Sequence, residues 1–180
     1  MSNPKTSPRF IKRVVLKNYK SIAACDIELQ PLSFLVGPNG SGKSNFIDAL
    51  RLVTDSLRAS LDHALRDRGG IQEVRRRSGG HPTHFGIRLD FDLPTGQSGH
   101  YAFRVGARPR GGFEVQTEEC HLRSFKKRKS AFFTVREGAL ASSVSPAPAV
   151  AKDRLFLVNA SGLPEFRDVY EALSSMGFYN

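Results

Sequence analysis

The chain has 180 residues, of which 39% are hydrophobic, and this suffices for a packed core in one domain of ordinary size. No apolar run approaches the roughly 20 residues that cross a bilayer, and the polar start from Met1 to Lys5 lacks the apolar stretch of a secretory signal. We therefore expect a globular cytoplasmic protein with no membrane partner. The net charge of +10, from 27 Lys and Arg against 17 Asp and Glu, favours a polyanionic partner.

The first elements are two predicted strands. Residues 1–9 are polar with two prolines and predict a flexible tail, after which Ile11 to Tyr19 predicts the first strand. Apolar and polar residues alternate from Cys25 to Gln30, which predicts a second strand with one face on the core and one in water.

A short apolar run, Leu32 to Val36, predicts a third strand that is buried on both faces. It leads into Gly37-Pro38-Asn39-Gly40-Ser41-Gly42-Lys43-Ser44, which matches the phosphate-binding P-loop G-x-x-x-x-G-K-[ST] at every fixed position. Apolar residues then recur at steps of three or four from Phe46 to Leu61, which predicts a helix. The motif therefore has the strand before it and the helix after it that a phosphate site requires.

The chemistry of a triphosphate explains these residue types. Closely spaced anionic oxygens need many inward-pointing backbone N–H groups, and the glycines at 37, 40 and 42 permit that approach. Lys43 is expected to reach the β- and γ-phosphates, where it is the candidate catalytic residue, and the Ser44 hydroxyl is expected to bind Mg²⁺. The loop predicts ATP and Mg²⁺ as cofactors.

The rest of the chain predicts a mainly antiparallel arrangement. Residues 66–84 carry two Gly-Gly pairs and Pro82, and predict an irregular basic connection. Four apolar-alternating segments with short turns then predict an antiparallel meander over residues 85–137, because the gaps are too short for crossover helices. Residues 138–152 predict a linker, Leu155 to Val158 a short buried strand, and Pro164 the start of a last helix.

Cys25 and Cys120 both fall on predicted strands, and neither has a second Cys or a His at metal-ligand spacing. We expect core or edge thiols at these positions and no zinc site involving them.

Two basic runs are candidates for contact with nucleic acid. Their residues are Arg75, Arg76 and Arg77, and Lys126, Lys127, Arg128 and Lys129. Such runs are also common on solvated loops, so the alternative is an exposed surface with no ligand.

The segment Lys17-Asn18-Tyr19-Lys20-Ser21, the amphipathic strand and the loop from Leu35 to Asn45 together resemble the start of an SMC/RecF-type ATPase head, a group of the ABC ATPases. The order is also similar to bacterial "AAA family ATPases" of the overcoming-lysogenization and anti-phage type. By this resemblance Lys20, Ser21 and Asn45 join the nucleotide site, and Asn39 shapes the γ-phosphate environment across a dimer interface. An antiparallel β-subdomain beside the P-loop sheet is also implied.

In this family hydrolysis requires an apolar strand that ends in Asp-Glu, and a signature segment that reaches the partner's nucleotide. The nearest candidate, Leu155 to Val158, ends in Asn159-Ala160. The resemblance therefore implies an N-terminal lobe that a C-terminal half or a partner subunit completes, and it favours a dimer. Gln72 and Gln116 are internal glutamines, and neither is assigned as the Mg²⁺-sensing residue.

The fold class that we expect is α/β, a P-loop NTPase of the ABC-head type with an antiparallel β-subdomain. Its segments are 1–9, 10–65, 66–84, 85–137, 138–152 and 153–180, with 10–180 forming an incomplete head. The expected function is ATP binding coupled to work on DNA in repair, chromosome maintenance or phage defence. The alternatives are a non-catalytic basic module with a vestigial P-loop and a small P-loop kinase.

Overall fold

The computed structural model describes residues 10–77, 82–124 and 129–179. In these residues seven strands form one sheet in the order β2-β1-β3-β4-β5-β6-β7, and every neighbouring pair is antiparallel. The elements in chain order are β1 Ile11–Tyr19, β2 Ile22–Glu28, α1 Lys43–Arg58, α2 Leu61–Arg66, α3 Ile71–Val74, β3 His84–Asp92, β4 Gln97–Ala107, β5 Phe113–Ser124, β6 Lys129–Arg136, β7 Ala139–Ser142, α4 Phe156–Ala160 and α5 Pro164–Ser174.

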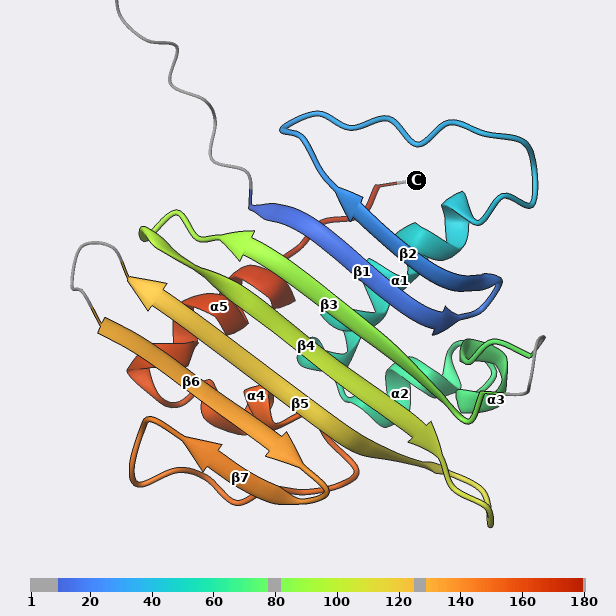
Figure 1. Cartoon of the computed structure of the whole chain (residues 1–180). Helices are drawn as coiled ribbons and strands as arrows, with labels where there is room; N and C mark the ends of the chain where they lie inside the picture. Colours follow the sequence, from blue (N-terminus) through green and yellow to red (C-terminus); the bar gives the residue numbers. More distant parts are fainter. Residues whose placement is uncertain (1–9, 78–81, 125–128, 180) are drawn as a thin grey trace, which may run out of the picture.

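The core lies between the sheet and the helices, which cover one of its faces (Figure 1). Alternate residues of each central strand point into this core, as in β3, where Phe85 and Leu89 are fully buried. Phe133 of β6 makes edge contacts with Phe156 and Phe166, at centroid distances of 4.8 and 5.2 Å. The last two helices are therefore part of the same core as the meander.

The α1 helix packs against α5 through polar contacts as well as apolar ones. The Thr54 hydroxyl donates to the Leu173 carbonyl at 3.1 Å, and the Tyr170 hydroxyl donates to the Leu57 carbonyl at 3.1 Å. Each bond joins residues more than 110 positions apart in the sequence. The position of α1, which follows the P-loop, is therefore stabilised by α5 near the C-terminus.

Most of the sequence predictions for the strands are confirmed. The first strand, the hairpin of β3 and β4, and the two further strands of the meander lie where the sequence predicts them, whereas the second strand, predicted over 25–30, runs from Ile22 to Glu28. Cys120 is buried and Cys25 is half-buried, as expected for core and edge thiols. The last helix begins at Pro164 and buries Phe166.

The predicted third strand is wrong. Residues 32–36 form no strand, and the apolar side chains of Leu32, Phe34 and Val36 are 72%, 77% and 87% exposed. In Figure 1 this stretch is part of a loop that arches away from the sheet between β2 and α1. An extended segment becomes a strand only where a neighbour pairs with its backbone, and no described strand lies beside this one.

The predicted strand at residues 155–158 is also wrong, because the apolar run enters α4. Burial was predicted correctly, since Leu155, Phe156 and Leu157 are all buried. A short apolar run does not distinguish a buried strand from a buried helix. Here a distant carboxylate selects the helix: Glu118 of β5 accepts the N–H of Phe156 at 2.5 Å and that of Leu157 at 2.8 Å.

Three predicted boundaries need smaller corrections. The helix after the P-loop ends at Arg58, and Ser60 caps a separate helix, α2, by accepting the His63 N–H at 3.1 Å. The connection 66–84 contains α3, which buries Ile71 and Val74. The linker 138–152 contains β7, whose backbone extends the sheet by pairing with β6. The tail 1–9 lies outside the described residues.

No helix within the described ranges is long and apolar enough to cross a membrane.

Candidate nucleotide site

The P-loop lies between the end of the long loop and the start of α1. Gly40 and Gly42 have φ of 80° and 95°, in the left-handed region that non-glycine residues adopt only with strain. Gly42 is the residue immediately before α1, so the glycine turn delivers the chain directly to a helix N-terminus. A Cβ at Gly42 would lie 3.4 Å from Ile22 Cγ1 and 3.6 Å from Ser21 Oγ. These are ordinary contact distances, so it is the backbone angle that favours glycine there.

The Lys43 side chain folds back over this loop. Its ammonium donates to the carbonyl of Gly37 at 2.7 Å, to that of Pro38 at 2.8 Å and to Ser41 Oγ at 3.3 Å. The cation therefore lies over the loop, surrounded by oxygen acceptors, and phosphate oxygens offer the same type of contact. Ser44 follows as the second residue of α1 with an exposed side chain, as a hydroxyl that binds Mg²⁺ requires.

Two further predicted residues lie together at the loop. The amide of Asn45 donates to Ser21 Oγ at 2.7 Å, which joins the start of α1 to the turn between β1 and β2. A surface hollow of about 620 Å³ is lined by Ser21, by residues 34–38 and 40–43, and by one side of β2. Its volume is in the range of small-ligand sites. The donor set and the hollow fit a nucleotide triphosphate.

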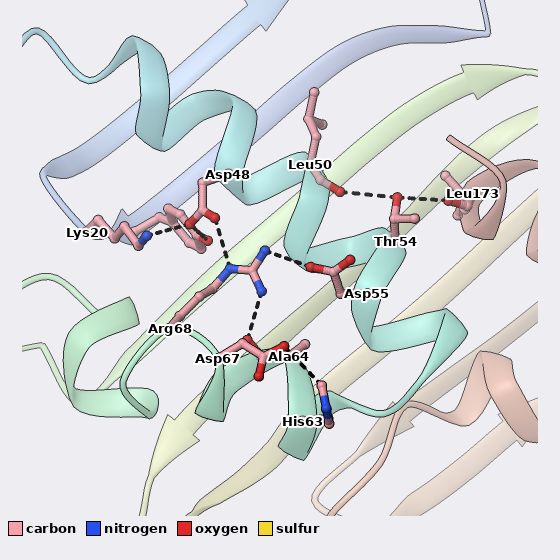
Figure 2. Close-up of polar contacts among 11 residues, drawn as sticks. Lys20, Asp48, Leu50, Thr54, Asp55, His63, Ala64, Asp67, Arg68 and Leu173 are labelled. Atoms are coloured by element: carbon pink, nitrogen blue, oxygen red, sulfur yellow. Dashed lines mark hydrogen bonds and ion pairs between the residues drawn. The ribbon is translucent and has the colours of Figure 1, made fainter. Parts of the chain in front are cut away.

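Lys20 forms an ion pair with Asp48 of α1 (Figure 2). Its ammonium lies 2.6 Å from Asp48 Oδ2, and the same carboxylate accepts the Tyr19 hydroxyl at 2.7 Å and Arg68 Nε at 3.0 Å. Arg68 also donates to Asp55 Oδ2 at 2.9 Å. Lys20 therefore contacts a protein carboxylate in this structure, and a nucleotide would have to compete with Asp48 for its ammonium.

Electrostatics stabilise this Lys20–Asp48–Arg68 network. Partial burial by itself raises the pKa of Asp48, but hydrogen bonds from Lys20 and Tyr19 and the Arg68 charge outweigh it and leave the pKa below its usual range. The pKa of Arg68 is raised: burial lowers it, but the bond to Asp55 and the charges of Asp48 and Asp55 together outweigh that effect. Sequence reasoning missed Asp48 and Arg68, because nothing in the local pattern links a position on α1 and one in the turn after α2 to the turn at Lys20.

The arginine run at 75–77 lies beside the same turn. The Arg76 N–H donates to the Asn18 carbonyl at 2.8 Å, and Arg75 forms an isolated β-bridge with Tyr19. Arg75 and Arg77 line a hollow of about 530 Å³ together with Lys20, Asn45, Arg68 and Glu73. The structure thus places this basic run next to the candidate nucleotide site.

Local partners hold the side chains of this run. Arg75 Nε donates to Gln72 Oε1 at 2.7 Å, Arg75 Nη1 donates to the Pro82 carbonyl at 2.8 Å, and Arg77 pairs with Glu73. Contacts with Gln72 and Glu73 of α3 and with Pro82 therefore fix the positions of the Arg75 and Arg77 guanidinium groups.

The second basic run falls mostly outside the described residues. Lys126, Lys127 and Arg128 are among the residues that the structure does not describe, and Lys129 begins β6.

Comparison with known proteins gives local similarity to two kinds of protein. The chain is 43% identical over 44 residues to "DNA replication and repair protein RecF" of Vibrio vulnificus (strain YJ016), which covers 24% of this chain and 12% of that protein. It is 49% identical over 55 residues to "Chromosome partition protein Smc" of Desulfitobacterium hafniense (strain Y51), covering 29% of this chain and 5% of that protein. The match thus spans a small part of each relative's length.

Two solved structures are also similar. One, described as "Structural biochemistry of ATP-driven dimerization and DNA stimulated activation of SMC ATPases", has a TM-score of 0.44 at 25% identity, covering 64% of this chain and 70% of that one. The other, a RecF–ATP structure, has a TM-score of 0.39 at 17% identity, covering 64% of this chain and 28% of that one.

The family model described as "AAA ATPase domain" matches residues 10–126, well over half of the chain. This range contains the P-loop, the helix after it and the first strands of the meander. The chain belongs to the AAA ATPase domain family, as an N-terminal lobe of the SMC/RecF-like type.

Proposed function

We propose that this chain is the ATP-binding N-terminal lobe of an SMC/RecF-like ATPase that couples ATP binding and hydrolysis to work on DNA. The observation that carries the proposal is the P-loop itself, with left-handed glycines at 40 and 42 and the Lys43 ammonium folded over the loop among three oxygens. Repair, chromosome maintenance and phage defence are the processes in which such work would take place.

The loop and the start of α1 would hold the triphosphate. Backbone N–H groups of residues 39–44 and the N-terminus of α1 would bind the phosphates, and Lys43 would exchange its loop carbonyls for phosphate oxygens. Ser44 would hold Mg²⁺, which neutralises charge on the β- and γ-phosphates when it is bound. Ser21, oriented by Asn45, would close one side of the site.

The water-activating carboxylate would come from a C-terminal half or a partner subunit. The nearest candidate for this role, residues 155–158, is followed by Asn159-Ala160 and enters α4, on the core side of the sheet. This requirement is the reason to propose that the lobe works in an assembly, as a dimer or with its complementing half.

Nucleotide binding tests the first part of the proposal. Titration of Mg-ATP into wild type and Lys43→Ala, followed by calorimetry, should give an affinity at least tenfold lower for the variant, because charge-assisted hydrogen bonds are removed. Lys12→Ala is the matched control, since Lys12 pairs with Asp92 on β3 and does not contact the P-loop. Equal affinities of wild type and Lys43→Ala would contradict ATP binding through this motif and favour a basic module with a vestigial P-loop.

DNA binding tests the second part. The hollow lined by Arg75, Arg77 and Lys20 supports a polyanion contact near the nucleotide site. Replacing Arg75, Arg76 and Arg77 by Gln should weaken binding and reduce the slope of log K against log salt, by up to about 0.9 for each phosphate that the variant no longer neutralises. A variant with three other exposed arginines replaced, Arg108, Arg110 and Arg154, has the same net charge. If that control shows an equal reduction of the slope, the run at 75–77 is not the DNA site.

A further inference from the structure

The face of the sheet opposite the helices carries a cluster of potential metal ligands. His100 of β4 and Glu119 and His121 of β5 have side chains on this face, since their neighbours Tyr101 and Cys120 point into the core. This cluster belongs to the meander, whereas the P-loop precedes α1 on the helical side of β1 and β2 (Figure 1). It is therefore separate from the candidate nucleotide site.

The strand register brings the three side chains together. His100 and His121 are direct cross-strand partners, and their rings stack at a centroid distance of 4.9 Å with an interplanar angle of 13°. Glu119, two residues before His121, points to the same face, and its Oε1 lies 3.1 Å from His100 Nε2. One donor atom from each of the three residues lies within 4.8 Å of the others.

Two small residues make room for this arrangement. Ala102 is the cross-strand partner of Glu119, so the carboxylate meets only a methyl group on β4 and leans towards His100. Gly99 precedes His100, and a Cβ there would lie 1.9 Å from the His121 carbonyl oxygen. The strands therefore approach closely at the histidine pair only because residue 99 is glycine.

The surroundings also hold the ligands in place. Phe132 of β6 stacks on the His121 ring at 5.5 Å, and the side chains of His100 and Glu119 are 19% and 30% exposed. Arg88 pairs mainly with Asp90 at 2.9 Å and lies 3.8 Å from Glu119 Oε1. Partial burial and the Arg88 charge lower the pKa of His100, although the contact with Glu119 partly offsets this.

We propose that His100, Glu119 and His121 form a binding site for a divalent transition metal ion of the Zn²⁺ type, with water at the remaining position. Two imidazoles and one carboxylate are a donor set that Zn²⁺ accepts, and hard ions such as Mg²⁺ prefer oxygen ligands alone. Tetrahedral zinc places its ligand atoms about 3.3 Å apart, so side-chain rotations that close the 4.8 Å spread complete the site.

Co²⁺ and Zn²⁺ binding to the full chain without an affinity tag tests this site. Wild type should bind one Co²⁺ with the visible absorption of a four-coordinate ion, and Zn²⁺ should displace it. His121→Ala and Glu119→Gln should each weaken Zn²⁺ binding at least tenfold. Both positions face solvent at least in part, so thermal unfolding checks that these variants fold. His84→Ala is the control, since His84 lies on the same face at the far end of β3 and should bind as wild type does.

The result that overturns the proposal is specific. If wild type takes up no Co²⁺, or if His121→Ala binds Zn²⁺ as tightly as wild type does, the three residues do not form a metal site. A loss in His84→Ala equal to that in His121→Ala would indicate adventitious binding to surface histidines only. Mg-ATP affinity of His121→Ala should equal that of wild type, so the outcome for this site does not depend on the proposed nucleotide function.

Discussion

The P-loop and the junction of Glu118 with α4 are built in opposite ways. In the loop, Lys43 bonds to carbonyls at most six residues away, and left-handed glycines set the backbone. At the junction, Glu118 accepts N–H groups 38 and 39 residues away, and the Tyr101 hydroxyl at 2.9 Å. The P-loop is therefore encoded by neighbours in sequence, whereas the fold that carries it depends on contacts between distant residues.

The largest effect should follow from removing the carboxylate at the junction. Glu118→Ala leaves two buried N–H groups and the Tyr101 hydroxyl without their acceptor, so we expect a loss of about 4 kcal/mol in the free energy of unfolding. Urea denaturation at pH 6 measures this. Glu114→Ala, at a partly exposed position near Arg108, should cost less than about 0.5 kcal/mol. A similar small cost for Glu118→Ala would show that the junction does not hold the fold.

The same residue should make stability depend on pH. Burial raises the pKa of Glu118 to about 7 in the folded protein, although the bonds from Leu157, Phe156 and Tyr101 partly offset it. Because the folded pKa lies above the unfolded value of 4.5, the protonated form is favoured in the fold. The stabilisation is present below pH 4.5 and is lost as pH rises through 7, by about 3 kcal/mol. Glu118→Gln does not titrate, so its stability measured from pH 4.5 to 8 should lack this decline. Equal slopes for both proteins would contradict the raised pKa.

At the P-loop we expect a smaller effect that acts on binding. Gly42→Ala places a Cβ at φ 95°, which costs about 1–2 kcal/mol and disfavours the backbone conformation of the loop. Mg-ATP affinity should fall about tenfold. Gly111→Ala is the matched control, since its φ is 90° with open space around it, in the β4–β5 turn. The control should lose similar stability and keep its Mg-ATP affinity; a parallel fall in its affinity would mean that the loss reflects stability and not the loop.

The smallest effect should come from the Lys20–Asp48–Arg68 network. This network joins the β1–β2 turn, α1 and the turn after α2. Asp48→Asn removes the charge that holds Lys20 and Arg68, and should cost about 1 kcal/mol in unfolding experiments. Asp62→Asn breaks only the exposed pair with Arg66 and should cost at most about half of that. If the two variants have equal stability, the network contributes nothing beyond a surface ion pair.

Prediction from sequence succeeded where the signal was periodic or local. The alternation from Phe85 to Leu93 is a property of the strand itself, so β3 and its inward residues followed directly. It failed at two apolar runs, Leu32 to Val36 and Leu155 to Val158. Both look like buried strands, but the first finds no pairing neighbour in the described sheet, and the second meets Glu118, whose carboxylate caps a helix.

The candidate site shows the same division. The motif predicted the loop glycines, Lys43 and Ser44, and the resemblance to SMC/RecF heads predicted Ser21, which Asn45 contacts in the structure. Asp48 and Arg68 could not be predicted, because tertiary packing brings α1 and the turn after α2 to Lys20.

The P-loop, the antiparallel meander and the excess of basic residues could be predicted from the sequence, because each depends on residue type and on spacing within a few positions. The exposure of 32–36, the helix at 156–160, the position of Arg75 beside the β1–β2 turn and the pairing of His100 with His121 depend on tertiary contacts. Strand register and side-chain capping are set by partners dozens of residues away in the sequence. The residues near an element therefore do not identify the partner that it will contact.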